Sequence, residues 1–112
     1  MSKKLHKEEY KLVVRNSKHK INHLVRIFNT LKLPLKVVKR KKIDLFEVHI
    51  EKRFDLMAIK NALNKIKISK NSCSIVVNLI SNSDMDGLTL PQHIGELYKF
   101  VGGKLSLNLF LV

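Results

Sequence analysis

The final forty residues, 73–112, constrain the fold of this chain most, because several local patterns agree there. The apolar run over 73–80 predicts a strand, and the polar residues 81–87 predict a turn that follows it. The last segment, 105–112, alternates leucine with Ser, Asn, Phe and Val. This two-residue period is typical of a strand, and we expect this last strand to be paired inside a sheet.

A helix is predicted between these two strands. Pro91 suits the first turn of a helix, where its missing amide hydrogen costs nothing. The apolar residues that follow recur at helical spacing and comprise Ile94, Leu97, Tyr98 and Val101. Gly102 and Gly103 then end the helix, since glycine accepts the left-handed conformation. The stretch is therefore a strand, a helix and a strand.

In the first third of the chain, too, apolar residues at strand spacing are followed by apolar residues at helical spacing. Residues 10–15 alternate, with Tyr10, Leu12 and Val14 on one face, and predict a half-buried strand. Asn16 and Ser17 can cap a helix that follows. The apolar stripe along one face of that helix comprises Ile21, Leu24, Val25, Phe28 and Leu31. Pro34 should end it, because proline disfavours helical backbone in the residue before it.

The middle of the chain predicts two strands and a second helix. The strands cover 35–39 and 43–52, and four consecutive cations, 39–42, should lie in a solvated hairpin tip or strand end between them. In the second strand Phe46, Val48 and Ile50 share one face. Asp55 is a plausible cap for the helix. Its stripe comprises Leu56, Ile59, Leu63 and Ile66.

The predicted order is thus strand, helix, strand, strand, helix, strand, helix, strand. The first six elements match the split βαβ arrangement of ferredoxin-like α+β folds. We therefore expect one mostly antiparallel sheet with the helices packed mainly on one face. A strand that follows a helix crossover favours a parallel relation to another strand of the sheet. The whole chain, 1–112, is predicted to be one domain, with residues 1–8 as a flexible basic arm.

Charge is the strongest signal in the composition. The chain carries 22 Lys and Arg against 9 Asp and Glu, a formal net charge of +13. Residues 1–70 hold 20 of the basic residues and six of the acidic ones. Such asymmetry favours an acidic partner for the first part of the chain, although a lysine-rich coding bias would also produce it. The candidate partner-binding residues are Lys36, Lys39, Arg40, Lys41, Lys42, Lys60, Lys65 and Lys67.

No motif predicts catalysis, a metal or a cofactor. His19 and His23 lie four residues apart on one helix, but their neighbours are lysines, which would repel a cation. Asp84 and Asp86 lack the further ligands of a calcium loop and are better explained by a turn. The single cysteine, Cys73, lies in an apolar strand and should pack as a small hydrophobic residue. We predict that the protein is not an enzyme.

Two further predictions concern the cellular location and the nature of the ligand. No apolar run approaches the roughly 18 residues that span a bilayer, and residues 1–9 carry no apolar segment of a secretion signal, so we expect a cytoplasmic protein. Nucleic acid remains an alternative partner. The strand at 43–52 lacks the glycines and paired aromatics of RNA-recognition domains, so such binding would be mainly electrostatic.

Three segments carry a resemblance to a known family. They are the strand SIVVNLI, the GLTLP start of a helix and the final LSLNLFLV, and LKLPLKVVKRK agrees more loosely. Together they resemble a family of small uncharacterised bacterial α/β domains. Those domains begin the helix on a Leu-Ser-Pro-Glu-like motif and finish on a Leu-Asp-Ile-Asp-Ile-Tyr-Val-like strand. This chain departs from the pattern at Ser106 and Asn108, which replace acids, at Lys32, which replaces a glycine, and at Phe46, the nearest candidate for a usual tryptophan.

The resemblance implies a small cytoplasmic bacterial protein without known catalysis. Members of this kind are often suspected of being immunity or partner-binding proteins in toxin systems. No functional residue carries over from the family. Together with the charge, this predicts a non-enzymatic protein that recognises an acidic protein partner, such as a toxin that it inhibits by occlusion, with RNA or DNA binding as the alternative.

Overall fold

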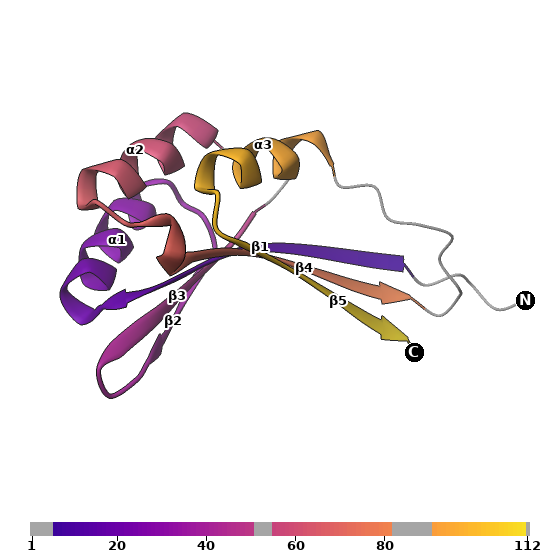
Figure 1. Ribbon diagram of the computed structural model, residues 1–112, viewed down its shortest axis with the longest axis horizontal. Helices are drawn as coiled ribbons and strands as arrows, with labels where there is room; N and C mark the ends of the chain where they lie inside the picture. Colours follow the sequence, from indigo (N-terminus) through magenta and orange to yellow (C-terminus); the bar gives the residue numbers. More distant parts are fainter. Residues whose placement is uncertain (1–5, 51–54, 82–90, 112) are drawn as a thin grey trace, which may run out of the picture.

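The computed structural model describes residues 6–50, 55–81 and 91–111. This part of the chain forms one five-stranded sheet and three α-helices, which confirms the predicted α+β class (Figure 1). The elements follow in the order β1 (His6–Ser17), α1 (Lys18–Thr30), β2 (Leu35–Lys39), β3 (Ile43–His49), α2 (Leu56–Ile66), the short 3-10 helix η1 (Lys70–Ser72), β4 (Cys73–Ser81), α3 (Gln92–Val101) and β5 (Lys104–Leu111).

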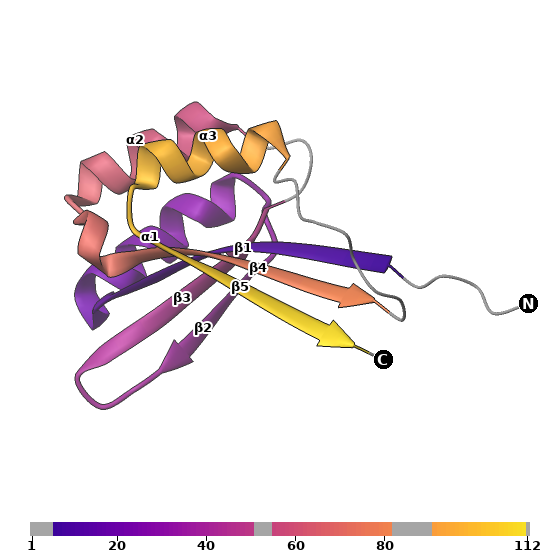
Figure 2. The same ribbon diagram turned by 45° about the vertical axis from the view of Figure 1, so that its right-hand side comes forward.

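The strands lie in the order β2-β3-β1-β4-β5. β1 runs antiparallel to both of its neighbours, β3 and β4, and β2 runs antiparallel to β3. β4 and β5 are parallel, as the helical crossover between them predicted. Both ribbon views show α1, α2 and α3 on the same side of the sheet (Figures 1 and 2). We call this side the helix face and the opposite side, on which no described helix lies, the open face.

β1 is the central strand, paired with β3 along one edge and with β4 along the other. On the helix face Leu12 and Val14 are fully buried, and on the open face Val13 is only 7% exposed. Leu12 lies opposite Val48 of β3 and Ile75 of β4, so the apolar positions of three strands form one row under the helices. The sheet therefore has a continuous core on the helix face.

The helices begin where the capping residues predicted. Ser17 accepts a hydrogen bond from the Lys20 amide, and Asp55 Oδ1 accepts one from the Ala58 amide at 3.0 Å. The predicted stripes are largely buried. In α1 the Phe28 ring lies edge-on to the Phe46 ring of β3, with centroids 5.1 Å apart. This aromatic pair joins the first helix to the sheet.

Some boundaries differ from the prediction. β1 begins at His6, so residues 6–8 of the predicted basic arm are part of the sheet and pair with the end of β4. Pro91 caps α3 instead of lying in its first turn. The end of the strand predicted over 43–52 and most of the turn predicted over 81–87 lie outside the described residues.

β5 is paired within the sheet, as expected, and it lies at the edge, a position that the sequence left open. Among the described strands its neighbour is β4, whose other side is occupied by β1. The alternating apolar residues of β5 are consequently left in part uncovered. Leu107 and Leu109 are 54% and 56% exposed, and Phe110 is 49% exposed.

Candidate interface at the basic end

Three segments that are far apart in sequence meet at one end of the molecule. They are the first turn of α1, the turn between β2 and β3, and the last turn of α2, all at the left of Figure 1. Two hydrogen bonds join them. Lys18 Nζ reaches the Arg40 carbonyl oxygen at 2.6 Å, and Lys20 Nζ reaches the Lys67 carbonyl oxygen at 3.2 Å. We call the cationic residues of these segments the basic end. They are Lys18, Lys20, Lys39, Arg40, Lys41, Lys42, Lys65 and Lys67.

Lys18 holds the β2–β3 turn against the start of α1. Its ammonium lies 2.7 Å from Asp44 Oδ1, and the same oxygen accepts the Arg40 backbone amide at 3.3 Å. Asp44 is only 2% exposed. The hydrogen bond from Lys18 lowers the pKa of the Asp44 carboxyl, helped by the Arg40 amide and opposed by burial. The buried carboxylate thus fixes the shape of the turn from inside.

Acid should therefore weaken this part of the fold. Because the pKa of Asp44 is lower in the folded protein than in the unfolded chain, its stabilising contribution is complete above about pH 4 and is lost as the pH falls through the folded value. Asp44→Asn should lower the melting temperature at about pH 7. The difference from the wild type should then narrow as the pH is lowered to about 3, measured by circular dichroism.

Glu96→Gln is the control for Asp44→Asn, since Glu96 is an exposed carboxylate on α3. Its effect on the melting temperature should be small at every pH. A difference between Asp44→Asn and the wild type that stayed constant from neutral to acid pH would show that the charge of Asp44 does not stabilise the fold.

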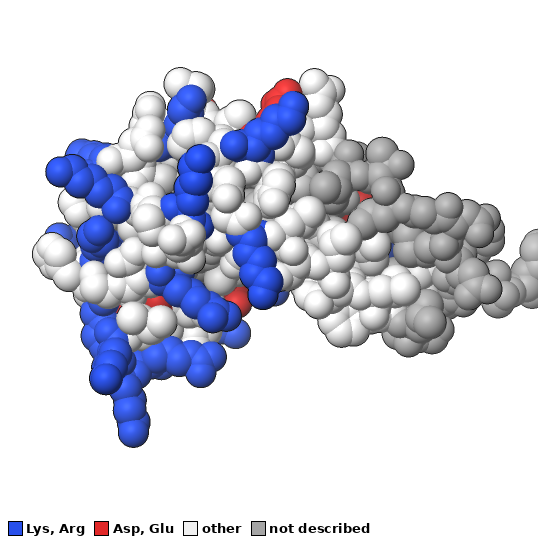
Figure 3. Space-filling model, viewed as in Figure 1, with Lys and Arg blue, Asp and Glu red and all other residues white. Residues whose placement is uncertain are grey.

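The other cations of the turn face solvent and form no ion pair with a described residue. Lys39, Arg40, Lys41 and Lys42 are all exposed. Among the described residues the ion pairs are Lys18 with Asp44 and Lys7 with Glu9, so none involves these four side chains. Figure 3 shows basic side chains concentrated at this end of the molecule. Positive charges that are not neutralised locally raise the electrostatic potential and attract an anionic partner.

Six of the eight predicted partner-binding residues belong to the basic end. The other two lie elsewhere. Lys36 is on the open face, opposite Glu47 of β3. The ammonium of Lys60 lies 4.8 Å from the centroid of the Phe100 ring and so joins α2 to α3. The sequence interpretation did not include Lys18 and Lys20, although their position directly after the capping Ser17 places them in the first turn of α1.

A shallow hollow on the open face extends the basic end. It has a volume of about 340 Å³ and is lined by Arg15, Arg40, Ile43 and Leu45. Arg15 lies opposite Leu45 in the β1–β3 register, so both side chains share this face. Guanidinium groups bind carboxylates or phosphates with two parallel hydrogen bonds, and the two apolar residues can contact a hydrophobic neighbour of such a group. The sequence interpretation did not include Arg15.

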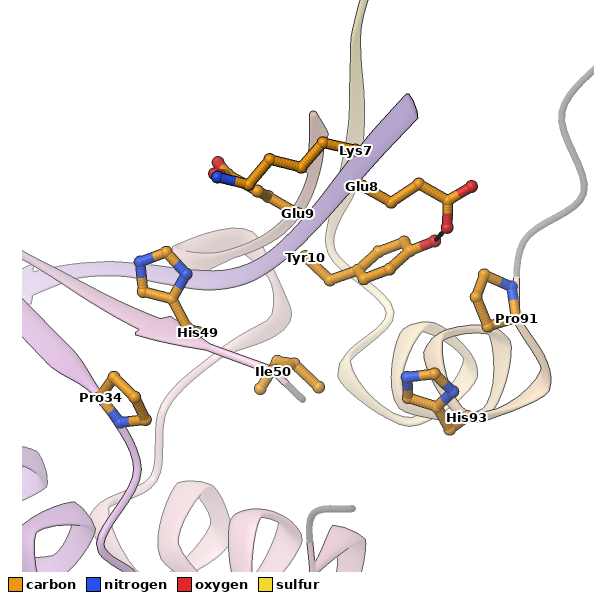
Figure 4. A pocket seen from close by; sticks show the side chains of 9 residues that line it. All are labelled: Lys7, Glu8, Glu9, Tyr10, Pro34, His49, Ile50, Pro91 and His93. Carbon is orange, nitrogen blue, oxygen red and sulfur yellow. Dashed lines mark hydrogen bonds and ion pairs between the residues drawn. The ribbon is translucent and has the colours of Figure 1, made fainter. Parts of the chain in front are cut away.

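A larger cleft of about 760 Å³ lies beside the first residues of β1 and the end of β3 (Figure 4). Its lining comprises Lys7, Glu8, Glu9, Tyr10, Pro34, His49, Ile50, Pro91 and His93. The Tyr10 hydroxyl donates to Glu8, and the Tyr10 and His93 rings meet edge to face at 6.1 Å. Burial, followed by the hydrogen bond to Glu8, raises the pKa of Tyr10.

The ionisable groups of this cleft do not converge on one point. Figure 4 shows Lys7, Glu9 and His49 on one side of β1, and Glu8, Tyr10 and His93 on the other. Glu9 is paired with Lys7 at 3.3 Å, which lowers its pKa. General acid–base catalysis needs the participating groups within hydrogen-bond reach of one substrate atom. Within residues 6–50, 55–81 and 91–111 no group of three His, Cys, Asp or Glu could hold a metal ion.

Cys73 is the remaining reactive side chain, and it packs as predicted. It is 5% exposed, and burial raises the pKa of its thiol to about 11. The thiolate is the reactive form of cysteine, so this residue is unsuited to nucleophilic chemistry at neutral pH.

Comparison of the chain with protein families, with curated proteins and with solved structures finds no significant match. In the described part of the chain, no helix has the length and apolar character needed to cross a membrane. The basic end therefore has to be interpreted from its own chemistry.

Proposed function

We propose that this chain is a non-enzymatic binding protein that recognises an acidic protein partner through the basic end. One observation carries the proposal. Eight basic residues from three segments meet there, and within the described residues the carboxylate bonded to any of them is Asp44, which is buried and bonded to Lys18. Surface charge of one sign steers an oppositely charged partner and increases its rate of association.

The hollow next to the basic end favours a protein as that partner. Its two arginines lie beside Ile43, which is 43% exposed, and Leu45. A protein surface with acidic and apolar side chains can contact both kinds of residue at once. Interfaces typically combine apolar contacts with such charged groups, and arginine is enriched in them.

We extend the proposal to the fold and the biological role. The order β2-β3-β1-β4, with two helical crossovers, supports a ferredoxin-like arrangement to which α3 and β5 are added. A cytoplasmic immunity protein, which inhibits an acidic toxin by covering it, agrees with this fold, with the charge and with the resemblance to small bacterial α/β domains. Such inhibition needs no catalytic residue.

Nucleic acid is the second candidate, and the exposed β2–β3 turn favours it. Four consecutive exposed cations, 39–42, can contact successive phosphates. The open face adds little to such binding. Glu47 would repel phosphate, and Phe110 is the only aromatic side chain that β1 to β5 expose by more than about a third within the described residues. Binding of this kind would be electrostatic and independent of base sequence.

Neutralising the turn tests the proposal. The variant replaces Lys39, Arg40, Lys41 and Lys42 by Gln, and the probes are an acidic peptide rich in Glu and Leu and a duplex DNA of random sequence. Binding of the peptide to the variant should weaken at least about tenfold at about 50 mM salt. Measurement is by fluorescence anisotropy, repeated at about 200 mM salt to give the salt dependence.

The control replaces Arg26, Lys32, Lys99 and Lys104 by Gln and loses the same four charges outside the basic end. It should bind the peptide nearly as the wild type does. An equal loss of affinity for the peptide in both variants would show that binding depends only on the net charge, and this would contradict the proposal. The nucleic-acid function would be favoured instead if the wild type bound the DNA more tightly than the peptide. The slope of the logarithm of the DNA-binding constant against the logarithm of the salt concentration should then be less steep by about 3 to 4 in the turn variant.

A further inference from the structure

β5 combines three properties that sheet edges in soluble proteins normally avoid. It is eight residues long, no described strand pairs with its outer edge, and after Lys104 it carries no charged residue up to Leu111. Natural edge strands are usually short or protected by Lys, Pro or a bulge, because a bare edge pairs with other strands. The opposite edge, β2, is protected in this way. It has five residues, and two of them are Lys36 and Lys39.

The exposed apolar side chains of the described residues concentrate on the same strand. Of the five large ones, Leu107, Leu109 and Phe110 belong to β5. Leu107 and Leu109 lie opposite Val77 and Leu79 of β4, which are buried on the helix face, so both leucines continue the row of the core. One more strand beside β5 would place its own apolar side chains next to this row on the same face.

We propose that the occupant is the β5 strand of a second copy of this chain, paired antiparallel to form a dimer with one ten-stranded sheet. The strand is complementary to itself. In an antiparallel pair, facing residues share one side of the sheet, so matching the two faces places Leu107 opposite Leu107 or Leu109 of the other copy. On the open face Asn108 then lies opposite Ser106 in the first register and opposite Asn108 in the second. Residues 105–111 carry no charge, so in neither register do two charged side chains of this segment face each other.

The charge distribution favours the antiparallel direction and a second copy. β5 starts near the basic end and points away from it (Figure 2). A two-fold axis through β5 therefore places the two basic ends at opposite ends of the dimer, where their repulsion is smallest. An acidic partner would gain little from β5, because the strand offers it no cation beyond Lys104.

The dimer should be weak and should strengthen as salt is added. Two eight-residue strands form a seam about 27 Å long, which is short for a protein interface, so we expect association in the micromolar range. Each copy carries a formal charge of +13, and salt screens the repulsion between them. Binding of an acidic partner at the basic end would show the opposite salt dependence, which distinguishes the two surfaces. This inference does not rest on the proposed function.

Sedimentation equilibrium of the full chain, from about 1 µM to about 1 mM protein, tests the dimer. The mass should rise from 13.0 kDa towards twice that value. Leu109→Lys puts a charge on the edge, and it should weaken association at least about tenfold while leaving the circular dichroism spectrum unchanged, since Leu109 is already 56% exposed. Leu107→Lys is a second variant with the same expectation. Asn61→Lys adds the same charge on an exposed position of α2 and should associate as the wild type does.

A wild-type chain that stays monomeric over the whole range overturns the proposal. Equal dimerisation of the wild type and both folded β5 variants would overturn it as well, because the dimer would then use another surface. Association that weakens as salt rises would also contradict a seam between two like-charged copies.

Discussion

Gly103→Ala should destabilise the fold by about 3 kcal/mol or more. A Cβ at this position would overlap the Cys73 carbonyl oxygen and lie 2.7 Å from the Lys70 carbonyl oxygen. Both are backbone atoms, so no side-chain rotation can relieve the overlap. The chain at Gly103 passes directly over the start of β4 on its way into β5. Urea unfolding, followed by circular dichroism, measures the loss.

Gly102→Ala is the matched control, one residue away. Its Cβ would meet only the flexible side chain of Lys70, at 3.0 Å, and the main cost is the left-handed backbone at φ 64. We expect a loss of about 1 to 2 kcal/mol. If Gly103→Ala proved no more destabilising than Gly102→Ala, the close approach of this backbone to β4 would be wrong.

Phe46→Ala should cost about 3 to 5 kcal/mol, close to the whole stability of a small domain. Phe46 is fully buried on β3 and touches the Phe28 ring of α1 edge to face. Truncation removes this contact and leaves a cavity between the first helix and the sheet. Thermal unfolding should show a broad transition at a much lower temperature, or a chain that is largely unfolded at about 25 °C.

Phe46→Leu and Met57→Ala separate the possible causes of such a loss. Leucine keeps most of the buried volume, so Phe46→Leu should be clearly less destabilising than Phe46→Ala. Met57 is 58% exposed on α2, and its truncation should change stability by no more than about 0.5 kcal/mol. Similar losses for Phe46→Ala and Met57→Ala would contradict the assignment of Phe46 to the core.

The helices of this fold are predictable because their signals are local. Ser17 and Asp55 are next to the helices that they cap, and the apolar stripes repeat every three or four residues. The start of β1 is different. Lys7 and Glu9 carry no apolar pattern, and they are extended because β4 pairs with them across Ile80 and Asn78. The edge position of β5 likewise depends on the order of the strands, which no segment encodes alone.

The candidate interface was predictable only where its cations are consecutive. The run 39–42 is visible in the sequence, and its place in a turn followed from repulsion between like charges. The role of Lys18 was not visible, because its partner Asp44 is 26 residues away. Arg15 joins the site for a similar reason, since only the pairing of β1 with β3 brings it next to Leu45. Side chains that depend on tertiary pairing cannot be assigned from spacing.

The central place of β1 also governs the order in which the molecule can assemble. Both neighbours of β1 follow it in the chain, and β4 comes last of the three. The Asn16 side-chain amide, for example, donates to Ser72, 56 residues later, in η1 directly before β4. Closing such long loops costs entropy before any contact compensates for it, which slows folding. During synthesis β1 therefore leaves the ribosome with both edges unpaired. Its pairing is complete only after β4 has been synthesised, when most of the chain has been made.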